Sequence, residues 1–456
     1  MSSRRAAALA PSRATAFRNP WCGAEIEIFV KLKPSVQGII QQKLRRNPRS
    51  MAGHWRDWDF DLENGTGNLD RKEKQRRCVG KAILEILDQT LGPNHRWSCE
   101  SDASLKEYTL THPPDTRKWW GIEIISPPFP ADSEWNVTFN QVFDAINRTF
   151  DLWTNDLTSC HVHVSPGPYK DSKYTMDQLA QVAKGAFFFE GALMGLLPAE
   201  RRMNRYALPN WSIYSPQQYY SVALQGWAPL FDRISRHAYQ HGNDTNAFAR
   251  RMTTMESSGE TTRYASTSFD PFARLGTVEF RRQAGVASAK TAIRRVLLAL
   301  TLHITALTMN FDNASRDVGR AHPTTENLIG TLFTTLKTYL PERAYKDAAF
   351  KTWLQQCARD YANDSDGEDQ FGRMVRRFDE VEINKREANM RAYGVYVVSS
   401  YLADADITDS HRGLPLRSRD SGPIYIGRVS HLIAHITNNQ PTAGYRNALS
   451  TRLVHV

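Results

Sequence analysis

The 456-residue chain lacks several patterns that mark common protein classes. Its five cysteines are scattered and form no Cys-x-x-Cys pair, which argues against a zinc ribbon, a dithiol redox centre or a disulfide scaffold. No P-loop or dinucleotide fingerprint is present, because the Gly-x-Gly at Gly65 and Gly67 has no strand before it and lacks the spacing after it. A nucleophile-elbow motif is also missing, so a serine or cysteine hydrolase lacks support.

Long apolar runs are missing as well. The most apolar run, Val296 to Met309, spans about 14 residues, whereas a transmembrane helix needs roughly 20. We therefore expect no membrane span, and the scattered cysteines favour an intracellular, cytoplasmic protein. Residues 1–19 are basic and contain no acid, which predicts a disordered tail and also fits a mitochondrial transit peptide.

Composition indicates an ordinary globular protein. Hydrophobic residues make up 41% of the chain, and the net charge of +10 suits nucleic acid, nucleotide triphosphates or acidic substrates equally. Alternating strand and helix patterns predict a mixed domain of strands and helices over residues 20–310, in which residues 47–69 form an insertion or flap. Residues 200–275 are expected to be rich in loops. Residues 311–456 are expected to form a helical C-terminal extension with a polar tail.

Four predicted strands have one apolar face and one ionisable face. Residues two apart share a face of a strand, so Glu25 and Glu27 lie together, about 7 Å apart, opposite their isoleucine neighbours. The polar faces of the other three strands carry Glu123; His161, His163 and Ser165; and Glu279, Arg281 and Gln283. Any one such face could simply contact water. The repeated choice of Glu, His, Arg and Gln favours convergence on one concave surface.

Converging glutamates repel one another unless a cation lies among them. Carboxylate oxygens with at most one imidazole suit Mg²⁺ or Mn²⁺ better than zinc, which prefers more nitrogen or sulfur ligands. A His-x-His pair alone would fit zinc. The combination with several glutamates therefore predicts a site for a hard divalent cation.

Five sequence blocks occur in a fixed order that is specific only as a set. The blocks are Gly23–Glu27 (GAEIE), Asp102–Leu105 (DASL), Gly121–Pro128 (GIEIISPP), Cys160–Val164 (CHVHV) and Thr277–Arg281 (TVEFR). In these blocks the chain resembles the amidoligase family, as a eukaryotic, fungal-type member. That family belongs to the superfamily of glutamine synthetase and glutamate-cysteine ligase.

The resemblance implies an α+β fold in which a curved, mainly antiparallel sheet of the glutamine-synthetase type cups the site, with helices packed on its convex side. It also implies an ATP-dependent carboxylate-amine ligase that forms an amide bond through an acyl phosphate. The implied cofactors are ATP and Mg²⁺ or Mn²⁺. The implied partners are a small-molecule or peptide carboxylate and an amine, and no nucleic acid is expected.

The resemblance also implies roles for individual residues. The implied metal ligands are Glu25, Glu27, Glu123, His163 and Glu279. The residues implied to contact ATP or its phosphates are His161, Arg201, Arg205 and Arg281, of which Arg281 and Arg205 are the catalytic candidates. Phosphoryl transfer depends on positioning and on cationic donors, and the planar guanidinium suits phosphate oxygens. The basic run at residues 201–206 could instead be a solvated turn.

Two other features of the sequence allow two interpretations each. Asp102 and Ser104 either orient a ligand or close a turn. Trp55 and Trp58 either stack on a base or peptide, or hold the insertion in place. Two other functions also fit the pattern: a metal-dependent hydrolase that uses the His-x-His pair with a glutamate base, and a non-catalytic module whose basic surface binds nucleic acid or protein.

Overall fold

The fold is described from a computed structural model. It divides into two compact units, Met1–Arg376 and Arg377–Val456. The residues described are 20–63, 68–101, 105, 118–168, 174–202, 204, 206–214, 216–255, 259, 261–346, 348–364, 372–373, 415–416 and 424–425. In the second unit, the described strands β9 (Pro415–Leu416) and β10 (Ile424–Tyr425) pair antiparallel.

An open eight-stranded sheet forms the centre of the first unit, with the order β2-β3-β1-β6-β8-β7 and with β4 and β5 also paired to β1. Its strands are β1 (Trp21–Leu32), β2 (Ser98–Glu100), β3 (Trp120–Ile125), β4 (Phe129–Pro130), β5 (Phe150–Trp153), β6 (Cys160–Ser165), β7 (Thr267–Ser268) and β8 (Val278–Phe280). Every neighbouring pair is antiparallel. The predicted α+β class and the mainly antiparallel sheet are therefore confirmed.

Helices make up most of the rest of this unit. They are α1 (Pro34–Arg46), η1 (Pro48–Ser50), α2 (Gly53–Arg56), α3 (Leu69–Leu91), α4 (Trp135–Thr149), α5 (Met176–Phe188), α6 (Glu190–Met194), α7 (Ala199–Arg202), α8 (Asn210–Tyr214), α9 (Pro216–Gln225), α10 (Ala228–His241), α11 (Thr245–Thr253), α12 (Phe272–Leu275), α13 (Ala289–Thr308), α14 (Phe311–Val318), α15 (Thr325–Tyr339), α16 (Glu342–Tyr345) and α17 (Phe350–Asp364). Helices α14 to α17, which follow residue 310, belong to the same unit.

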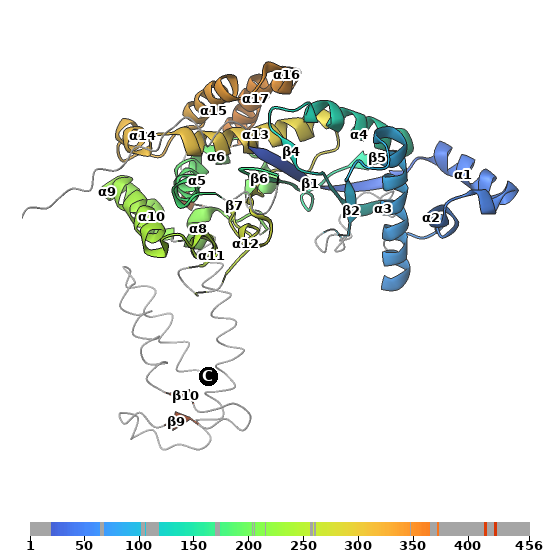
Figure 1. Ribbon diagram of the computed structural model, residues 1–456, viewed down its shortest axis with the longest axis horizontal. Coiled ribbons are helices and arrows are strands. Elements are labelled where there is room, and N and C mark those ends of the chain that lie inside the picture. The colour runs from blue at the N-terminus through green and yellow to red at the C-terminus, as the bar shows by residue number, and fades with distance from the viewer. Residues whose placement is uncertain are drawn as a thin grey trace, which may run out of the picture. The chain divides into compact units, whose positions relative to one another are not determined.

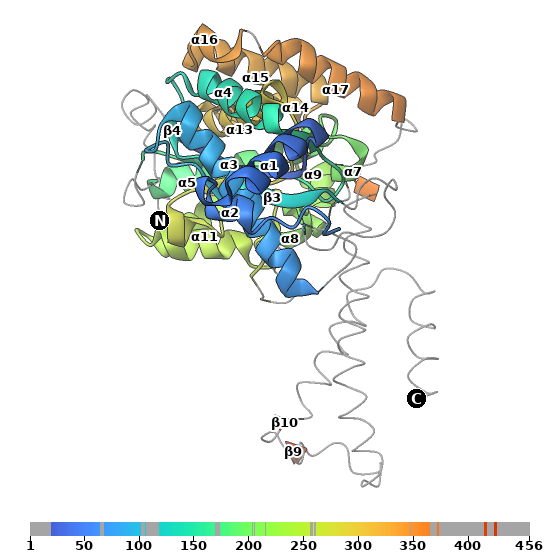
Figure 2. The same cartoon turned by 90° about the vertical axis from the view of Figure 1, so that its right-hand side faces the viewer.

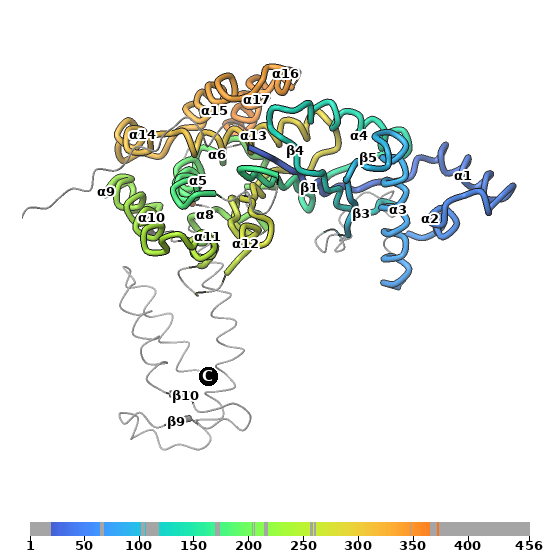
Figure 3. Tube along the Cα trace, viewed as in Figure 1, coloured from blue at the N-terminus to red at the C-terminus, as the bar shows by residue number. Residues whose placement is uncertain are grey.

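One face of the sheet is covered by helices. Helix α3 contacts β2 and β3, while α13 contacts β1, β6, α4 and α5. Figure 1 shows α15, α16 and α17 outside α13, and in Figures 1 and 2 helices α8 and α11 lie on the opposite side of this unit from them. In Figure 3, helices α1, α2 and α3 lie at one end of this unit, in blue. Helices α8 to α11 lie toward the other end, in green.

The helix-covered face of the sheet is apolar because the strands alternate. Ile26, Ile28, Val162, Val164 and Val278 are all buried completely. Removing this much apolar surface from water is the main force that fixes which face of each strand points inward. The ionisable residues at the intervening positions are therefore directed to the opposite face.

The expectation that residues 200–275 are rich in loops was wrong. The described residues in this range form six helices, α7 to α12, most of them short. In the longest, α10, the residues Leu230, Phe231, Ile234 and Ala238 are buried. Their spacing follows the helical period, but the surrounding Arg, Tyr and Asn residues obscured that pattern in the sequence.

The two tryptophans of the predicted insertion are buried. Trp55 and Trp58 stack with ring centroids 5.1 Å apart, and Trp58 stacks on Phe150 of β5 at 6.3 Å. The indole nitrogen of Trp55 donates to a carboxylate oxygen of Glu85 in α3 at 2.7 Å. The rings therefore hold this segment against the rest of the unit, which favours the structural reading of these residues.

Among the described residues, α13 is the one helix long and apolar enough to cross a bilayer. It is 20 residues long and includes all but the last residue of the apolar run seen in the sequence. Most of its residues are buried against α4, α5, α15 and β6. A core helix of a protein satisfies the same criteria of length and composition, and the packing of α13 matches that case.

Candidate metal and phosphate site

Strand register brings the predicted acidic and imidazole side chains onto one face of the sheet. Across β1 and β3, Glu27 pairs with Glu123. Across β1 and β6, Glu25 pairs with His161. Across β6 and β8, His163 pairs with Glu279. Because paired residues of neighbouring strands share a face, residues from four separated stretches of sequence form one cluster.

Two groups of three residues within this cluster have ligand atoms close enough to hold one ion each. The first is Glu25, Glu123 and His161, and the second is Glu25, His163 and Glu279. Within each group the ligand atoms all lie within 4.8 Å of one another. Glu25 belongs to both groups, and its side chain is 26% exposed, so the cluster stays open to solvent there.

Each histidine faces carboxylates from two strands. The Nδ1 atom of His161 lies 3.5 Å from Glu25 and 3.5 Å from Glu279. The Nε2 atom of His163 lies 3.1 Å from Glu25 and 3.8 Å from Glu279. Each of the two groups of three contains two carboxylates and one imidazole. This ligand set suits Mg²⁺ or Mn²⁺.

The hydrogen bonding of His163 tests whether the cluster fits a cation. Its Nδ1 atom is 2.9 Å from the hydroxyl of Thr277, which orients the ring. Its Nε2 atom is buried and forms no well-directed hydrogen bond, although carboxylate oxygens surround it. A buried polar atom without such a bond is costly. A cation among these oxygens would remove that cost, so the residues fit a divalent metal.

The electrostatic environment of the cluster couples its acids and bases. Burial raises the pKa of Glu25, but the close contacts with the imidazoles of His161 and His163 outweigh it and hold this pKa far below its ordinary value. Burial lowers the pKa of His163, whereas its close contact with the Glu25 carboxylate and the charge of Glu279 raise it, and the net pKa is raised. Glu25 is therefore ionised at neutral pH.

Glu27 lies at the inner end of the cluster and is only 4% exposed. One of its carboxylate oxygens accepts hydrogen bonds from the Ser159 backbone N–H at 2.8 Å and from the Ser159 hydroxyl at 2.5 Å. The Ser159 hydroxyl also lies 2.7 Å from Nε2 of His161. Glu27 is in neither of the two groups of three.

Two of the predicted arginines border the cluster. Arg281 forms an ion pair with Glu279, and its Nε donates to the backbone oxygen of Tyr206 at 3.3 Å. Arg201 is buried and donates to the backbone oxygens of Arg281 at 2.9 Å and Arg282 at 3.5 Å. Burial lowers the pKa of Arg201 to about 10, so it stays cationic at neutral pH.

Some of the predicted site residues lie outside the described residues, namely Arg205, Asp102 and Ser104. Ser159 and Thr277 were not among the predicted site residues, although their hydroxyl groups form hydrogen bonds with His161 and His163. Ser159 had a usable signal, because it is two residues before His161 and so shares its face. Thr277 had the same signal, because it is two residues before Glu279, although its contact with His163 joins residues 114 positions apart.

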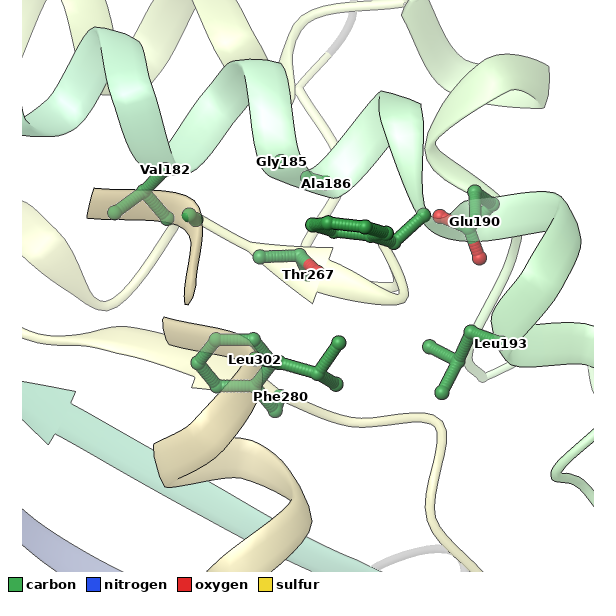
Figure 4. A pocket seen from close by; sticks show the side chains of 10 residues that line it. Val182, Gly185, Ala186, Glu190, Leu193, Thr267, Phe280 and Leu302 are labelled. Atoms are coloured by element: carbon green, nitrogen blue, oxygen red, sulfur yellow. The ribbon is translucent and has the colours of Figure 1, made fainter. Parts of the chain in front are cut away.

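A small cavity lies on the other side of the sheet, away from the cluster. Residues of α5, α6, β7, β8 and α13 line it, and Figure 4 shows Phe280, Leu302 and the carboxylate of Glu190 at its edge. Phe280 follows Glu279 in β8 and therefore points to the opposite face. The cavity is mainly apolar and contains none of the predicted site residues.

The profile of one known family, described as "Putative amidoligase enzyme", matches residues 19–303. The chain belongs to this family. The match covers all four strands of the cluster, and it confirms the resemblance that the five sequence blocks indicate. The amidoligase family name points to an enzyme that forms amide bonds. Comparison with curated protein sequences gives no match.

Proposed function

We propose that this amidoligase-family chain is an ATP-dependent carboxylate-amine ligase. The observation that carries the proposal is the cluster on one sheet face, in which Glu25 is shared between two groups of ligands for a hard divalent cation. An ATP-using enzyme needs cations that bridge the phosphate oxygens and neutralise their charge. A glutamine-synthetase type of fold remains part of this proposal.

The cations would be Mg²⁺ or Mn²⁺. Glu123 and His161 would complete one site, and His163 and Glu279 the other, with Glu25 common to both. The bound metals would supply charge neutralisation at the β- and γ-phosphates. Each site has one nitrogen and two carboxylate ligands, whereas catalytic zinc sites usually have more nitrogen or sulfur.

Arg281 is the candidate for contacting the transferred phosphoryl group. Its Nη1 pairs with Glu279 and its Nε binds the backbone of Tyr206. Its Nη2 makes no hydrogen bond with the described residues, so this end of the planar guanidinium can receive a phosphoryl oxygen. Arg201 holds the two carbonyl groups of residues 281 and 282 and so positions Arg281 from behind.

The proposed reaction has two steps. A carboxylate oxygen of the acid substrate attacks the γ-phosphorus of ATP, the bond from that phosphorus to the bridging oxygen breaks, and ADP leaves. The amine nitrogen then attacks the carbonyl carbon of the acyl phosphate. Phosphate leaves, the nitrogen loses a proton, and an amide remains.

The test is ATP turnover with a pool of candidate acids and amines in the presence of Mg²⁺. We expect release of ADP and phosphate that requires an acid, and hydroxylamine in place of the amine should trap the acyl group as a hydroxamate. Glu25→Gln should abolish turnover, because it weakens both proposed cation sites. Glu85→Gln, on α3 outside the cluster, is the matched control and should keep turnover.

Metal content separates this proposal from a hydrolase. A purified protein that holds zinc tightly, shows no affinity for ATP and cleaves amide or ester bonds would contradict the ligase and support the hydrolase. Binding of RNA or DNA that falls steeply with salt, in a folded protein without nucleotide affinity, would support a non-catalytic binding module instead.

A further inference from the structure

We propose that Glu27 and Ser159 do not bind the cation but position His161 so that its Nδ1 atom does. This inference rests on the cation site of the proposed function. It concerns positioning residues, because neither residue would contact substrate or metal.

The hydrogen bonds around Ser159 determine which nitrogen of His161 carries a proton. The Ser159 hydroxyl has one proton and lies 2.5 Å from the Glu27 carboxylate, which can only accept. The hydroxyl proton therefore goes to Glu27. The same hydroxyl oxygen lies 2.7 Å from Nε2 of His161, and it can only accept there. Nε2 of His161 must therefore carry a hydrogen.

In the neutral imidazole with a hydrogen on Nε2, Nδ1 has a lone pair. That atom faces Glu25 and Glu279, at 3.5 Å from each. Without a proton on Nδ1, this nitrogen and the neighbouring carboxylate oxygens repel one another unless a cation lies among them. The hydrogen bonds behind the ring thus make Nδ1 a ligand atom, as outer hydrogen bonds do in known metal sites.

Glu27 is poorly placed to be a ligand itself. Its Oε2 atom is occupied by two hydrogen bonds from Ser159. Its Oε1 atom lies 3.9 Å from Nε2 of His161, on the protonated side of the ring. The resemblance to the amidoligase family implies a metal role for Glu27, and the geometry assigns it a different one.

His163 has the complementary arrangement, which supports the same principle. Its Nδ1 atom is bonded to the hydroxyl of Thr277, and its Nε2 atom faces the carboxylates. In both rings a hydroxyl group from the protein holds the nitrogen that points away from Glu25 and Glu279. The two histidines differ only in which nitrogen is held.

The experiment measures binding of Mn²⁺ to the full chain without nucleotide, by calorimetry and by electron spin-echo spectroscopy of the coordinated ¹⁴N. We expect Ser159→Ala to weaken binding about 10- to 100-fold and to reduce the ¹⁴N signal, while the number of bound ions stays as in the wild type. Ser159→Thr keeps the hydroxyl and should restore both. Glu27→Gln should keep the number of ions, whereas Glu25→Gln should lower it.

Two results would overturn the inference while leaving the cation site intact. One is wild-type Mn²⁺ affinity and ¹⁴N signal in folded Ser159→Ala. The other is loss of a bound ion in Glu27→Gln, as for Glu25→Gln, which would make Glu27 a ligand. A wild-type protein that binds no Mn²⁺ would overturn the cation site of the proposed function and this inference together. Far-ultraviolet circular dichroism of each variant verifies that it is folded.

Discussion

The buried ion pair between Arg282 and Glu190 offers a sharp test of the packing behind the site. Both side chains are at most 2% exposed. Arg282 also donates to the backbone oxygen of Arg202 at 3.3 Å, so it links β8 to the segment that carries Arg201. Arg282→Met would leave the Glu190 carboxylate buried without this cation, which costs about 3–5 kcal/mol of unfolding free energy.

The pH dependence of the stability of Arg282→Met should reflect the same loss of a charged partner for Glu190. Burial raises the pKa of Glu190 even with Arg282 beside it, and removal of the arginine should raise that pKa further. A carboxyl whose folded pKa lies above its unfolded pKa stabilises the fold as pH falls through the folded value. The stability that Arg282→Met loses relative to the wild type should therefore become smaller as the pH is lowered.

The assay is urea unfolding followed by tryptophan fluorescence, with a double-mutant cycle. Replacing both partners, as Arg282→Met with Glu190→Leu, should be more stable than Arg282→Met alone, because no buried charge remains. The control is Arg71→Met, which breaks the exposed pair with Asp59 and should cost at most about 1 kcal/mol. A loss in Arg282→Met no larger than in this control would refute the reasoning.

Three further predictions concern packing and protonation. A Cβ atom added at Gly121 would lie 2.7 Å from Leu105 Cβ, so Gly121→Ala should cost about 1–3 kcal/mol in urea unfolding, whereas Gly330→Ala, with open space around it, should be neutral or stabilising. Burial lowers the pKa of His303 to about 3, so the wild type should lose about 2 kcal/mol of stability from pH 7 to 5 as the unfolded chain takes up a proton. His303→Phe should flatten that slope, and an unchanged slope would contradict the assignment. Trp58→Ala should lower the melting temperature through loss of about 3–5 kcal/mol of packing, and an unchanged melting temperature would favour a ligand-stacking role.

The composition of the candidate site could be predicted because strand alternation is a local rule. Glu25, Glu123, His161 and Glu279 each sit between apolar residues in sequence, and burial of those neighbours sends the polar side chains to the other face. The period of two residues needs no knowledge of the partner strand. The sequence therefore predicted which face each residue lies on, and the structure brings these faces together.

The helices between residues 200 and 275 were harder to predict. Elements α7, α8 and α12 have only four or five residues. Segments this short are marginal helices alone, since nucleation costs more than so few hydrogen bonds return. Contacts of α8 with α5 and of α11 with α12 supply the missing stabilisation, and these contacts join residues distant in sequence.

The sequence by itself determined the class of fold, the family and the set of acids and imidazoles that share one face of the sheet. Only the tertiary structure decided the register that makes Glu25 common to two ligand groups, and the hydrogen bonds from Ser159 and Thr277 that fix the orientation of each histidine. The physical reason is range: side-chain alternation follows from the backbone of one strand, whereas register and hydrogen bonds between strands depend on how the whole core packs.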